Sequence, residues 1–179
     1  MPNHQHQAIR IEPASAHDAA LILRLVTALA VYEKLEHQAV ATEKTLRETL
    51  FGPAPAAHVV IARVGDEAAG FALWFYNYST FLARPGLYLE DLFVLPEWRG
   101  HGVGTALLAH LAAKAVARGC GRMEWSGLDW NEPAIGFYRT LGAQVMEEWR
   151  ICRLTGETLA AVAKREVNRR PGPGSPADE

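Results

Sequence analysis

The stretch from Leu89 to Gly104, which reads LEDLFVLPEWRGHGVG, constrains the fold more than any other part of the chain. An apolar strand ends at Pro96, a glycine-rich turn follows, and residues 105–117 have the apolar spacing of a helix. Glycines let the backbone approach a ligand closely, and the first amide groups of a helix have no partner inside the helix. Together with the helix dipole, these amides predict a site for a phosphate or pyrophosphate.

The turn matches neither of two common phosphate-binding motifs. No Gly-Lys-Ser/Thr follows it, which excludes a Walker loop, and position 107 is Leu where the dinucleotide fingerprint G-x-G-x-x-G needs its third glycine. What remains is Arg-x-x-Gly-x-Gly, from Arg99 to Gly104, between a strand and a helix. The alternative is a plain connection in which the glycines only make the turn tight.

Composition limits the classes of protein to consider. The 179 residues are 49% hydrophobic, which suits one domain with a full core, and the net charge of −2 argues against nucleic-acid binding. Cys120 and Cys152 form no motif, no histidine pair has the spacing of metal ligands, and the N-terminus lacks the apolar core of a signal peptide. We expect a cytoplasmic protein without a metal, with one domain over residues 8–164 and disordered tails at 1–7 and 165–179.

Hydrophobic periodicity and turn residues predict the order β-α-α-β-β-β-α-β-α-β, followed by a short closing helix. The expected strands cover residues 8–12, 58–63, 68–78, 87–95, 122–126 and 143–154. The expected helices run from the Ser15 cap to Lys34, from the Thr42 cap to Leu50, over 105–118, from the Asn131 cap to Gly142, and over 158–164. Short turns make the early strands antiparallel, and the strands around helix 105–118 should be parallel.

In this context, the Arg-x-x-Gly-x-Gly turn resembles the acetyl-coenzyme A loop of the GNAT superfamily of N-acetyltransferases. The segments YLEDLFVLPEWRGHGVGTALL, WNEPAIGFYRTLGA, VYEKLEHQ and TEKTL are similar to those of its diamine, or spermidine/spermine, acetyltransferase branch. The similarity covers roughly residues 8–163. It implies an α/β fold with a mixed, mostly antiparallel central sheet, a splayed parallel strand pair and helices on both faces.

The resemblance also implies which residues hold acetyl-CoA. They are strand residues Leu92, Phe93 and Val94, the turn and helix start formed by Arg99, Gly100, His101, Gly102, Val103, Gly104 and Thr105, and, further along the chain, Asn131 and Tyr138. The backbone amides of the turn would hold the pyrophosphate, and the acyl arm would lie between the splayed strands.

Acetylation of an amine needs a proton acceptor and a proton donor, because an alkylammonium with a pKa near ~10.4 is not nucleophilic at pH 7. The resemblance assigns the first role to Glu90, acting through water, and the second to Tyr138, a phenol that can protonate the leaving thiolate. Without it, Glu90 and Asp91 are equal candidates, since strand neighbours face opposite sides, and Tyr138 equally suits packing.

The amine side of the site should be acidic. The resemblance places Tyr32, Glu33 and Glu36 there, and the sequence adds Glu90 and Asp91. Glu33 and Glu36 have the i,i+3 spacing that would put both on one helical face, although a solvated helix end would look the same. The branch carries an aspartate and a tryptophan before L-E-D, where this chain has Tyr78-Ser79-Thr80-Phe81, so a diamine or a lysine analogue such as thialysine becomes more credible than a long polyamine.

The reading favoured by the sequence is an acetyl-CoA-dependent N-acetyltransferase for a primary amine of a small cation. One alternative is a GNAT enzyme for a protein lysine, a protein N-terminus or an amino-sugar drug. A second is an acyl-CoA-binding module without catalysis, against which the presence of both Glu90 and Tyr138 argues. Members of the branch are dimers, and the aromatic segment Gly70–Tyr78 offers apolar area, so we expect a homodimer.

Overall fold

The computed structural model describes residues 8–165, and the tails expected to be disordered lie almost entirely outside this range. The chain divides between residues 129 and 130 into two units, and each is described by itself.

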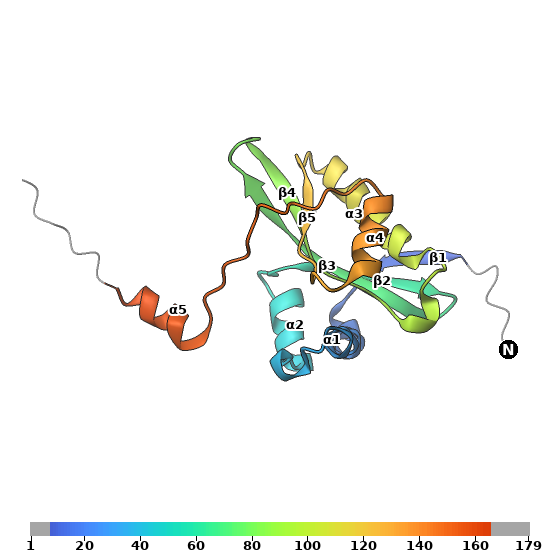
Figure 1. Ribbon diagram of the computed structural model, residues 1–179. Coiled ribbons are helices and arrows are strands. Elements are labelled where there is room, and N and C mark those ends of the chain that lie inside the picture. The colour runs from blue at the N-terminus through green and yellow to red at the C-terminus, as the bar shows by residue number, and fades with distance from the viewer. Residues whose placement is uncertain (1–7, 166–179) are drawn as a thin grey trace, which may run out of the picture. The chain divides into compact units, whose positions relative to one another are not determined.

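The first unit contains a five-stranded sheet with the order β1-β2-β3-β4-β5 (Figure 1). Its strands are β1 (Ile9–Pro13), β2 (His58–Val64), β3 (Glu67–Ser79), β4 (Arg84–Val94) and β5 (Met123–Trp125). The first four pair antiparallel through short connections, and β5 pairs parallel to β4 after the crossover through α3 (Val103–Ala117). The predicted pairing is confirmed, because a parallel pair needs a long connection and a hairpin does not.

Helices α1 (Ala19–Glu33) and α2 (Glu43–Phe51) cover one face of the sheet (Figure 1). Capping boxes precede both helices, from Ser15 before α1 and from Thr42 before α2, as their side chains predict. The apolar stripes of the two helices pack on this face of strands β2, β3 and β4 around the fully buried Phe71.

Helix α3 covers the opposite face. Leu107 and Leu111 are fully buried on its inner side, and the ammonium of Lys114 lies 5.9 Å from the ring centre of Trp74. Successive strand residues point to opposite faces, so Leu73 belongs to the α1 face and Trp74 to the α3 face. These two neighbouring side chains therefore lie on opposite faces of the sheet.

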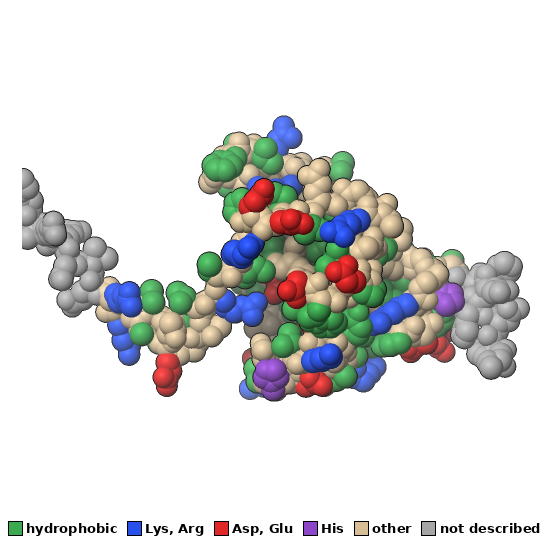
Figure 2. Space-filling model, viewed as in Figure 1, with side chains coloured by type: hydrophobic (Ala, Val, Ile, Leu, Met, Phe, Trp, Pro, Cys, Tyr) green, Lys and Arg blue, Asp and Glu red, His purple; other side chains and the backbone are tan. Residues whose placement is uncertain are grey.

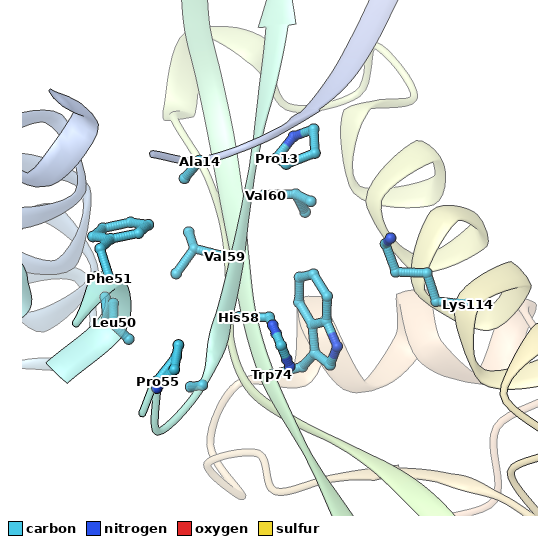
Figure 3. Close-up of a pocket in the computed structure, with 11 residues that line it drawn as sticks. Pro13, Ala14, Leu50, Phe51, Pro55, His58, Val59, Val60, Trp74 and Lys114 are labelled. Carbon is cyan, nitrogen blue, oxygen red and sulfur yellow. The ribbon is translucent and has the colours of Figure 1, made fainter. Parts of the chain in front are cut away.

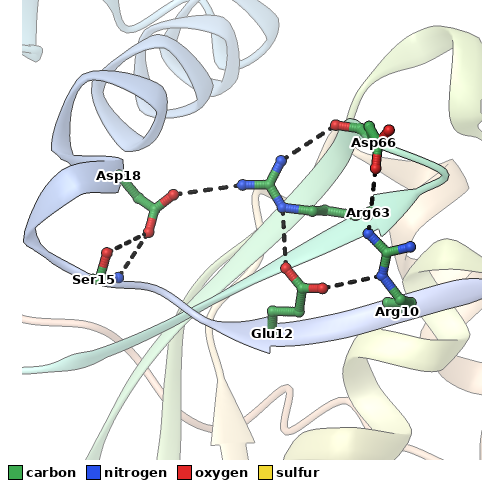
Figure 4. A network of polar contacts seen from close by, with 6 residues as sticks. All are labelled: Arg10, Glu12, Ser15, Asp18, Arg63 and Asp66. Atoms are coloured by element: carbon green, nitrogen blue, oxygen red, sulfur yellow. Dashed lines mark hydrogen bonds and ion pairs between the residues drawn. The ribbon is translucent and has the colours of Figure 1, made fainter.

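A polar network fixes β1 against β2 and against the start of the first helix (Figure 4). The guanidinium of Arg63 lies 3.2 Å from the carboxylate of Glu12 and 3.5 Å from that of Asp18, which is part of the Ser15 capping box. Arg10 contacts Glu12 from the other side at 3.0 Å. Because the two carboxylates and two guanidiniums alternate, charge is balanced along this edge without a ligand.

Strand β4 has a bulge, and its parallel pairing ends there. Asp91 pairs with Leu73 and Leu89 pairs with Trp74, so Glu90 is the extra residue without a partner on β3. Strand β5 pairs only with residues 87–89 of β4. The two parallel strands therefore part at the bulge, which is the splayed pair that the family resemblance implied.

The second unit contains α4 (Glu132–Thr140) and α5 (Gly156–Ala163). Asn131 caps α4 and Pro133 lies in its first turn, as predicted. The strand predicted over 143–154 is wrong, since none of these residues is in a strand. Their alternating apolar pattern is real, but within this unit they have no second strand with which to form a ladder, and apolar side chains such as Val145, Trp149 and Ile151 are exposed.

The segment expected to offer apolar area to a dimer, Gly70–Tyr78, is only partly exposed. Strand β3 is the central strand of the sheet, with neighbours on both sides, and both Phe71 and Trp74 are buried by helices of the same chain. Only the end near Tyr78 is exposed. Of its aromatic residues, two belong to the core and the others are half-buried or exposed, namely Phe75, Tyr76 and Tyr78.

Candidate active site

The turn before α3 leaves the helix N-terminus open. Gly100 and Gly102 have φ angles of 76° and 85°, in the left-handed region where a side chain is disfavoured. Gly102 is the N-cap residue, and no side chain caps the helix. The amides of residues 103–105 therefore have no partner within the helix, and they point out of its positive end. This arrangement fits a pyrophosphate, and the residues expected to hold acetyl-CoA supply it.

The side chain of Arg99 extends from this turn to the α1 face of the sheet. Its Nε donates a hydrogen bond to the carbonyl of Val94 at 3.0 Å. Its guanidinium carbon lies 4.5 Å from the ring centre of Tyr32 and 5.6 Å from that of Phe93. A residue expected on the cofactor side, Arg99, thus stacks on a residue expected on the amine side, Tyr32.

The other residues expected to contact the cofactor do not all lie on the same face of the sheet. His101 Nδ1 donates to the carbonyl of Arg99 at 2.8 Å, which closes the turn. Phe93 is buried in the core on the α1 face, whereas Leu92 is half-buried and its cross-strand partner Ala72 belongs to the α3 face. Phe93 therefore packs in the core, and Leu92 faces the side covered by α3.

The bulge decides how the two neighbouring carboxylates are presented. Glu90 is exposed at the bulge, and Asp91 is half-buried opposite Leu73 on the α1 face. Both lie where β4 leaves β5, and therefore at the mouth of the gap between the parallel strands. The bulge places one exposed and one half-buried carboxylate side by side.

Among the acidic side chains in the described part of the chain, Asp91 has the most strongly shifted pKa. Burial, the charge of Glu90 and the charge of Glu33 raise the pKa of Asp91 from its ordinary value near 3.8 to about 6. Burial also raises the pKa of Glu33. Glu33 ends α1, so that helix brings a second carboxylate toward the strand that carries the first.

No basic side chain balances this group of acids within residues 8–165. None of the three carboxylates, Glu33, Glu90 and Asp91, makes an ion pair with a described residue. Isolated burial of negative charge is costly, and this is why the pKa of Asp91 is raised. A cationic ligand would offset that cost, so the arrangement suits an ammonium group.

The predicted pairing of Glu33 with Glu36 on one helical face is wrong. Helix α1 ends at Glu33, Lys34 adopts a left-handed conformation with φ of 60°, and Glu36 begins a separate 3-10 turn, Glu36–Gln38. Glu33 is half-buried and Glu36 is exposed. A lysine gives no sequence signal for this left-handed stop, which glycine usually supplies. Of the two, only Glu33 affects the charge of Asp91.

Asn131 and Tyr138 belong to the second unit. Asn131 Oδ1 accepts a hydrogen bond from the Ala134 amide at 3.4 Å, so its side chain caps α4. Tyr138 is half-buried, and its ring centre lies 5.5 Å from that of Phe137. Both positions follow from the N-E-P-x-x-x-F-Y pattern, in which a capped helix presents the tyrosine in its last turn.

Two features of the site carry no strong sequence signal. The bulge at Glu90 has neither glycine nor proline near it, and the stacking of Arg99 on Tyr32 joins residues far apart in the sequence. On the face seen in Figure 2, basic and acidic side chains are interspersed and form no basic stripe. No group of three or more potential ligands for a metal ion occurs among the described residues. No helix described here is long and apolar enough to cross a membrane.

Comparison with known proteins finds N-acetyltransferases that are similar to this chain. L-ornithine N5-acetyltransferase NATA1 of Arabidopsis thaliana is 36% identical over 203 residues, covering 88% of this chain and 89% of its own. Thialysine N-epsilon-acetyltransferase of Mus musculus is 36% identical over 167 residues, covering 87% of this chain and 98% of its own. Both are similar to this chain over nearly their whole length.

A solved structure of an integron cassette protein from V. cholerae matches 89% of this chain and 100% of its own, with a TM-score of 0.76 and 27% identity. The acetyltransferase (GNAT) family profile matches residues 27–143, which include the Arg99–Gly104 turn, the β4 bulge and the Asn131–Tyr138 helix. The chain therefore belongs to the GNAT family of acetyltransferases and is an acetyl-transferring enzyme.

Proposed function

We propose that this enzyme transfers the acetyl group of acetyl-CoA directly to a primary amine of a small substrate that carries a second positive charge. The observation that carries the proposal is the unbalanced acidic group formed by Asp91, Glu33 and Glu90 at the mouth of the gap between β4 and β5. An anionic or neutral acceptor would leave the cost of burying the negative charge of Asp91 in place. A dication would offset it with one ammonium while it presents the other for reaction.

Relatives support the same class of acceptor. The names of two of them specify ornithine and thialysine, small molecules with a reactive side-chain amine and a second amine. A further relative, 30% identical over 167 residues, is a spermidine/spermine acetyltransferase-like protein of Homo sapiens, of which this chain covers only 24%. We therefore favour a diamine or a basic amino acid over a long polyamine, an amino-sugar drug or a peptide.

We propose roles for the residues from the family resemblance and from their chemistry. Acetyl-CoA would lie with its pyrophosphate on the amides of residues 103–105 and supplies the acetyl thioester. Glu90, exposed at the bulge, accepts the proton of the reactive ammonium through a water molecule. The freed amine nitrogen then bonds to the acetyl carbon as the carbon–sulfur bond breaks, and it gives up its second proton, which restores the phenol of Tyr138 after that group has protonated the thiolate.

Tyr138 gives its phenolic proton to the departing thiolate, and Asp91 with Glu33 holds the second ammonium of the substrate. No covalent acyl-enzyme is needed, because one carboxylate and one phenol account for both proton transfers. Cys120, the only half-buried thiol in the first unit, follows the C-terminus of α3 and is not required as a nucleophile.

A panel of amines with acetyl-CoA tests the proposal. Release of free thiol is followed with ornithine, thialysine, 1,4-diaminobutane, spermidine, an aminoglycoside and a lysine-containing peptide. Each dication is paired with its analogue that lacks the second ammonium, 5-aminopentanoate for ornithine and butylamine for 1,4-diaminobutane. The proposal expects small dications to be acetylated well and their analogues poorly. Turnover confined to the peptide or the aminoglycoside would contradict it.

We further propose that the enzyme is a homodimer, as in the diamine branch. Exposed apolar side chains in the second unit, including Trp149, Ile151 and Leu159, offer a surface for association that the buried strand β3 does not. Sedimentation at micromolar concentration tests this, and a monomer over the whole range would exclude it.

A further inference from the structure

A second pocket lies in the first unit at the end of β1, where β2 begins (Figure 3). Its volume is about 240 Å³, and its lining includes Pro13, Phe51, His58, Val60, Trp74 and Lys114. The reaction proposed above uses none of these residues. A volume somewhat below the roughly 300–1,000 Å³ of drug-sized sites suits a small ligand.

The indole of Trp74 lacks a hydrogen-bond partner in this pocket. The side chain is 4% exposed, and its Nε1 is buried without an acceptor among the described residues. An indole nitrogen can only donate, and a buried donor is normally paired. Figure 3 shows this nitrogen on the side of the ring from which Lys114 reaches in. A buried donor without an acceptor in the described chain therefore belongs to a residue that lines this pocket.

The charged and polar groups around the pocket point to an anion. The ammonium of Lys114 lies 5.9 Å from the centre of the Trp74 ring and makes no ion pair with any residue from 8 to 165. The imidazole of His58 stacks on the other side, with ring centres 5.4 Å apart. No aspartate or glutamate lines the pocket. Its hydrogen-bonding side chains can all donate, and none is an obligate acceptor.

The apolar walls determine what kind of anion fits. Val60 is fully buried, and together with Pro13 it gives apolar surface on the side of β2 that carries the polar groups, while Phe51 lies on the other side (Figure 3). A phosphate would gain little from such walls, and it usually binds where several amides or cations converge. A carboxylate with a compact apolar body would place its oxygens on Trp74 and Lys114 and its body against these walls.

We propose that this pocket is a second binding site, for a small monocarboxylate with an aromatic or branched apolar body. The carboxylate accepts the hydrogen bond of Trp74 Nε1 and pairs with the ammonium of Lys114. Its polar groups, Trp74 and Lys114, lie on the α3 face of the sheet, whereas Asp91 of the acetyl-transfer site lies on the α1 face. Trp74 pairs with Leu89, next to the Glu90 bulge.

Nuclear magnetic resonance of the indole N–H group tests the proposal with benzoate as the probe. The Trp74 signal is assigned as the one that disappears in Trp74→Phe. We expect benzoate to shift this signal downfield and saturably, while benzyl alcohol of the same shape, which has no charge, binds at least tenfold more weakly. A Trp74 signal that benzoate leaves unmoved, or an equal response to benzyl alcohol, would overturn the assignment.

A matched pair of lysine variants completes the test. Lys114→Met should weaken benzoate binding by roughly 10- to 100-fold, the effect of losing a charged hydrogen bond. Lys44→Met removes an exposed lysine of α2 that pairs with Glu48 and does not line the pocket, so it should leave the affinity unchanged. Equal affinities in the two variants would exclude Lys114 as the anion partner. Because neither variant alters a residue of the acetyl-transfer site, failure here would leave the proposed function standing.

Discussion

Leu73 and Trp74 are neighbours in β3, and the two faces of the sheet that they occupy carry opposite unbalanced charges. On the α1 face, Leu73 pairs with Asp91, whose charge is opposed by Glu33 and Glu90 and balanced by no described cation. On the α3 face, Trp74 lies beside Lys114, which no described acid balances. Elsewhere on the same sheet, the Arg10, Glu12, Arg63 and Asp18 network pairs every charge (Figure 4).

The contrast shows that a charged side chain without an ion-pair partner indicates a candidate site better than the mere presence of a charged side chain does. Glu12 and Asp18 have guanidinium partners and need no ligand, whereas Asp91 is half-buried without one. A cation fits the α1 face and an anion fits the α3 face.

We propose Tyr138 of α4, rather than a residue of the sheet, as the acid of the reaction. Tyr138→Phe removes one hydroxyl and keeps the ring against Phe137. We expect turnover to fall on the order of 10²–10⁴-fold, the effect of losing a general acid. Stability should change by only about 1 kcal/mol, the scale of one hydrogen bond.

Turnover and thermal melting measured on one preparation separate a chemical role of Tyr138 from a packing role. Phe137→Leu is the matched control, because it alters packing in the same helix and keeps the phenol. If Tyr138→Phe keeps more than about a third of wild-type turnover when chemistry limits the rate, the residue is not the acid.

The raised pKa of Asp91, about 6, makes the stability of the free enzyme depend on pH. Between pH 4 and 6 the folded protein binds this proton and the unfolded chain has released it, so the free energy of unfolding falls as pH rises. The loss should reach about 2–3 kcal/mol above pH 6. Asp91→Asn should remove this loss, and denaturant titrations from pH 4 to 7 measure it. If the free energy of unfolding changes with pH in the same way in the wild type and in Asp91→Asn, the pKa of Asp91 is not raised.

The open N-terminus of α3 can be tested without straining the backbone. Gly104 lies inside the helix, unlike Gly100 and Gly102 with their positive φ angles, so Gly104→Ala adds a methyl group at no conformational cost. If the pyrophosphate lies on this turn, affinity for acetyl-CoA should fall by about tenfold, the effect of about 1.4 kcal/mol, with an unchanged or higher melting temperature. If calorimetry shows an unchanged affinity of Gly104→Ala for acetyl-CoA, the pyrophosphate does not bind at this turn.

The smallest expected effect concerns the coupling between α1 and β4. Glu33→Gln removes a negative charge that raises the pKa of Asp91, so that pKa should fall by less than about one unit. Glu36→Gln is the matched control, since Glu36 is exposed on the following 3-10 turn and does not contribute. Carboxyl resonances followed through a pH titration report both. An equal change in the pKa of Asp91 in the two variants would show that Glu33 does not act on Asp91.

Local signals in the sequence were sufficient for much of the fold. Ser15 with Asp18, Thr42 and Asn131 cap helices as predicted, and the glycines before α3 form the predicted open turn. Each of these is a short-range pattern in which a side chain satisfies backbone groups within a few residues. The pairing of the strands followed from the lengths of their connections.

What the sequence did not predict depends on distant contacts. The bulge that separates Glu90 from Asp91 follows from how β4 registers on β3, and the left-handed Lys34 that separates Glu33 from Glu36 has no glycine to announce it. Residues 143–154 have the alternation of a strand, but a strand also needs a neighbour, which alternation does not specify. The pocket beside Trp74 is lined by residues of β1, α2, β2, β3 and α3, which are spread over the chain from Pro13 to Lys114.

The most direct measurement of the central claim is the preference for a second ammonium in Asp91→Asn. The ratio of kcat/KM for 1,4-diaminobutane to that for butylamine, or for ornithine to that for 5-aminopentanoate, is compared with the ratio in the wild type. Asp66→Asn, which removes an exposed aspartate in the turn between β2 and β3, is the control. We predict that the ratio falls by at least about tenfold in Asp91→Asn, the effect of losing one charged contact, and stays unchanged in Asp66→Asn. A ratio that stays at the wild-type value in Asp91→Asn would contradict the assignment of the α1 face to a cation.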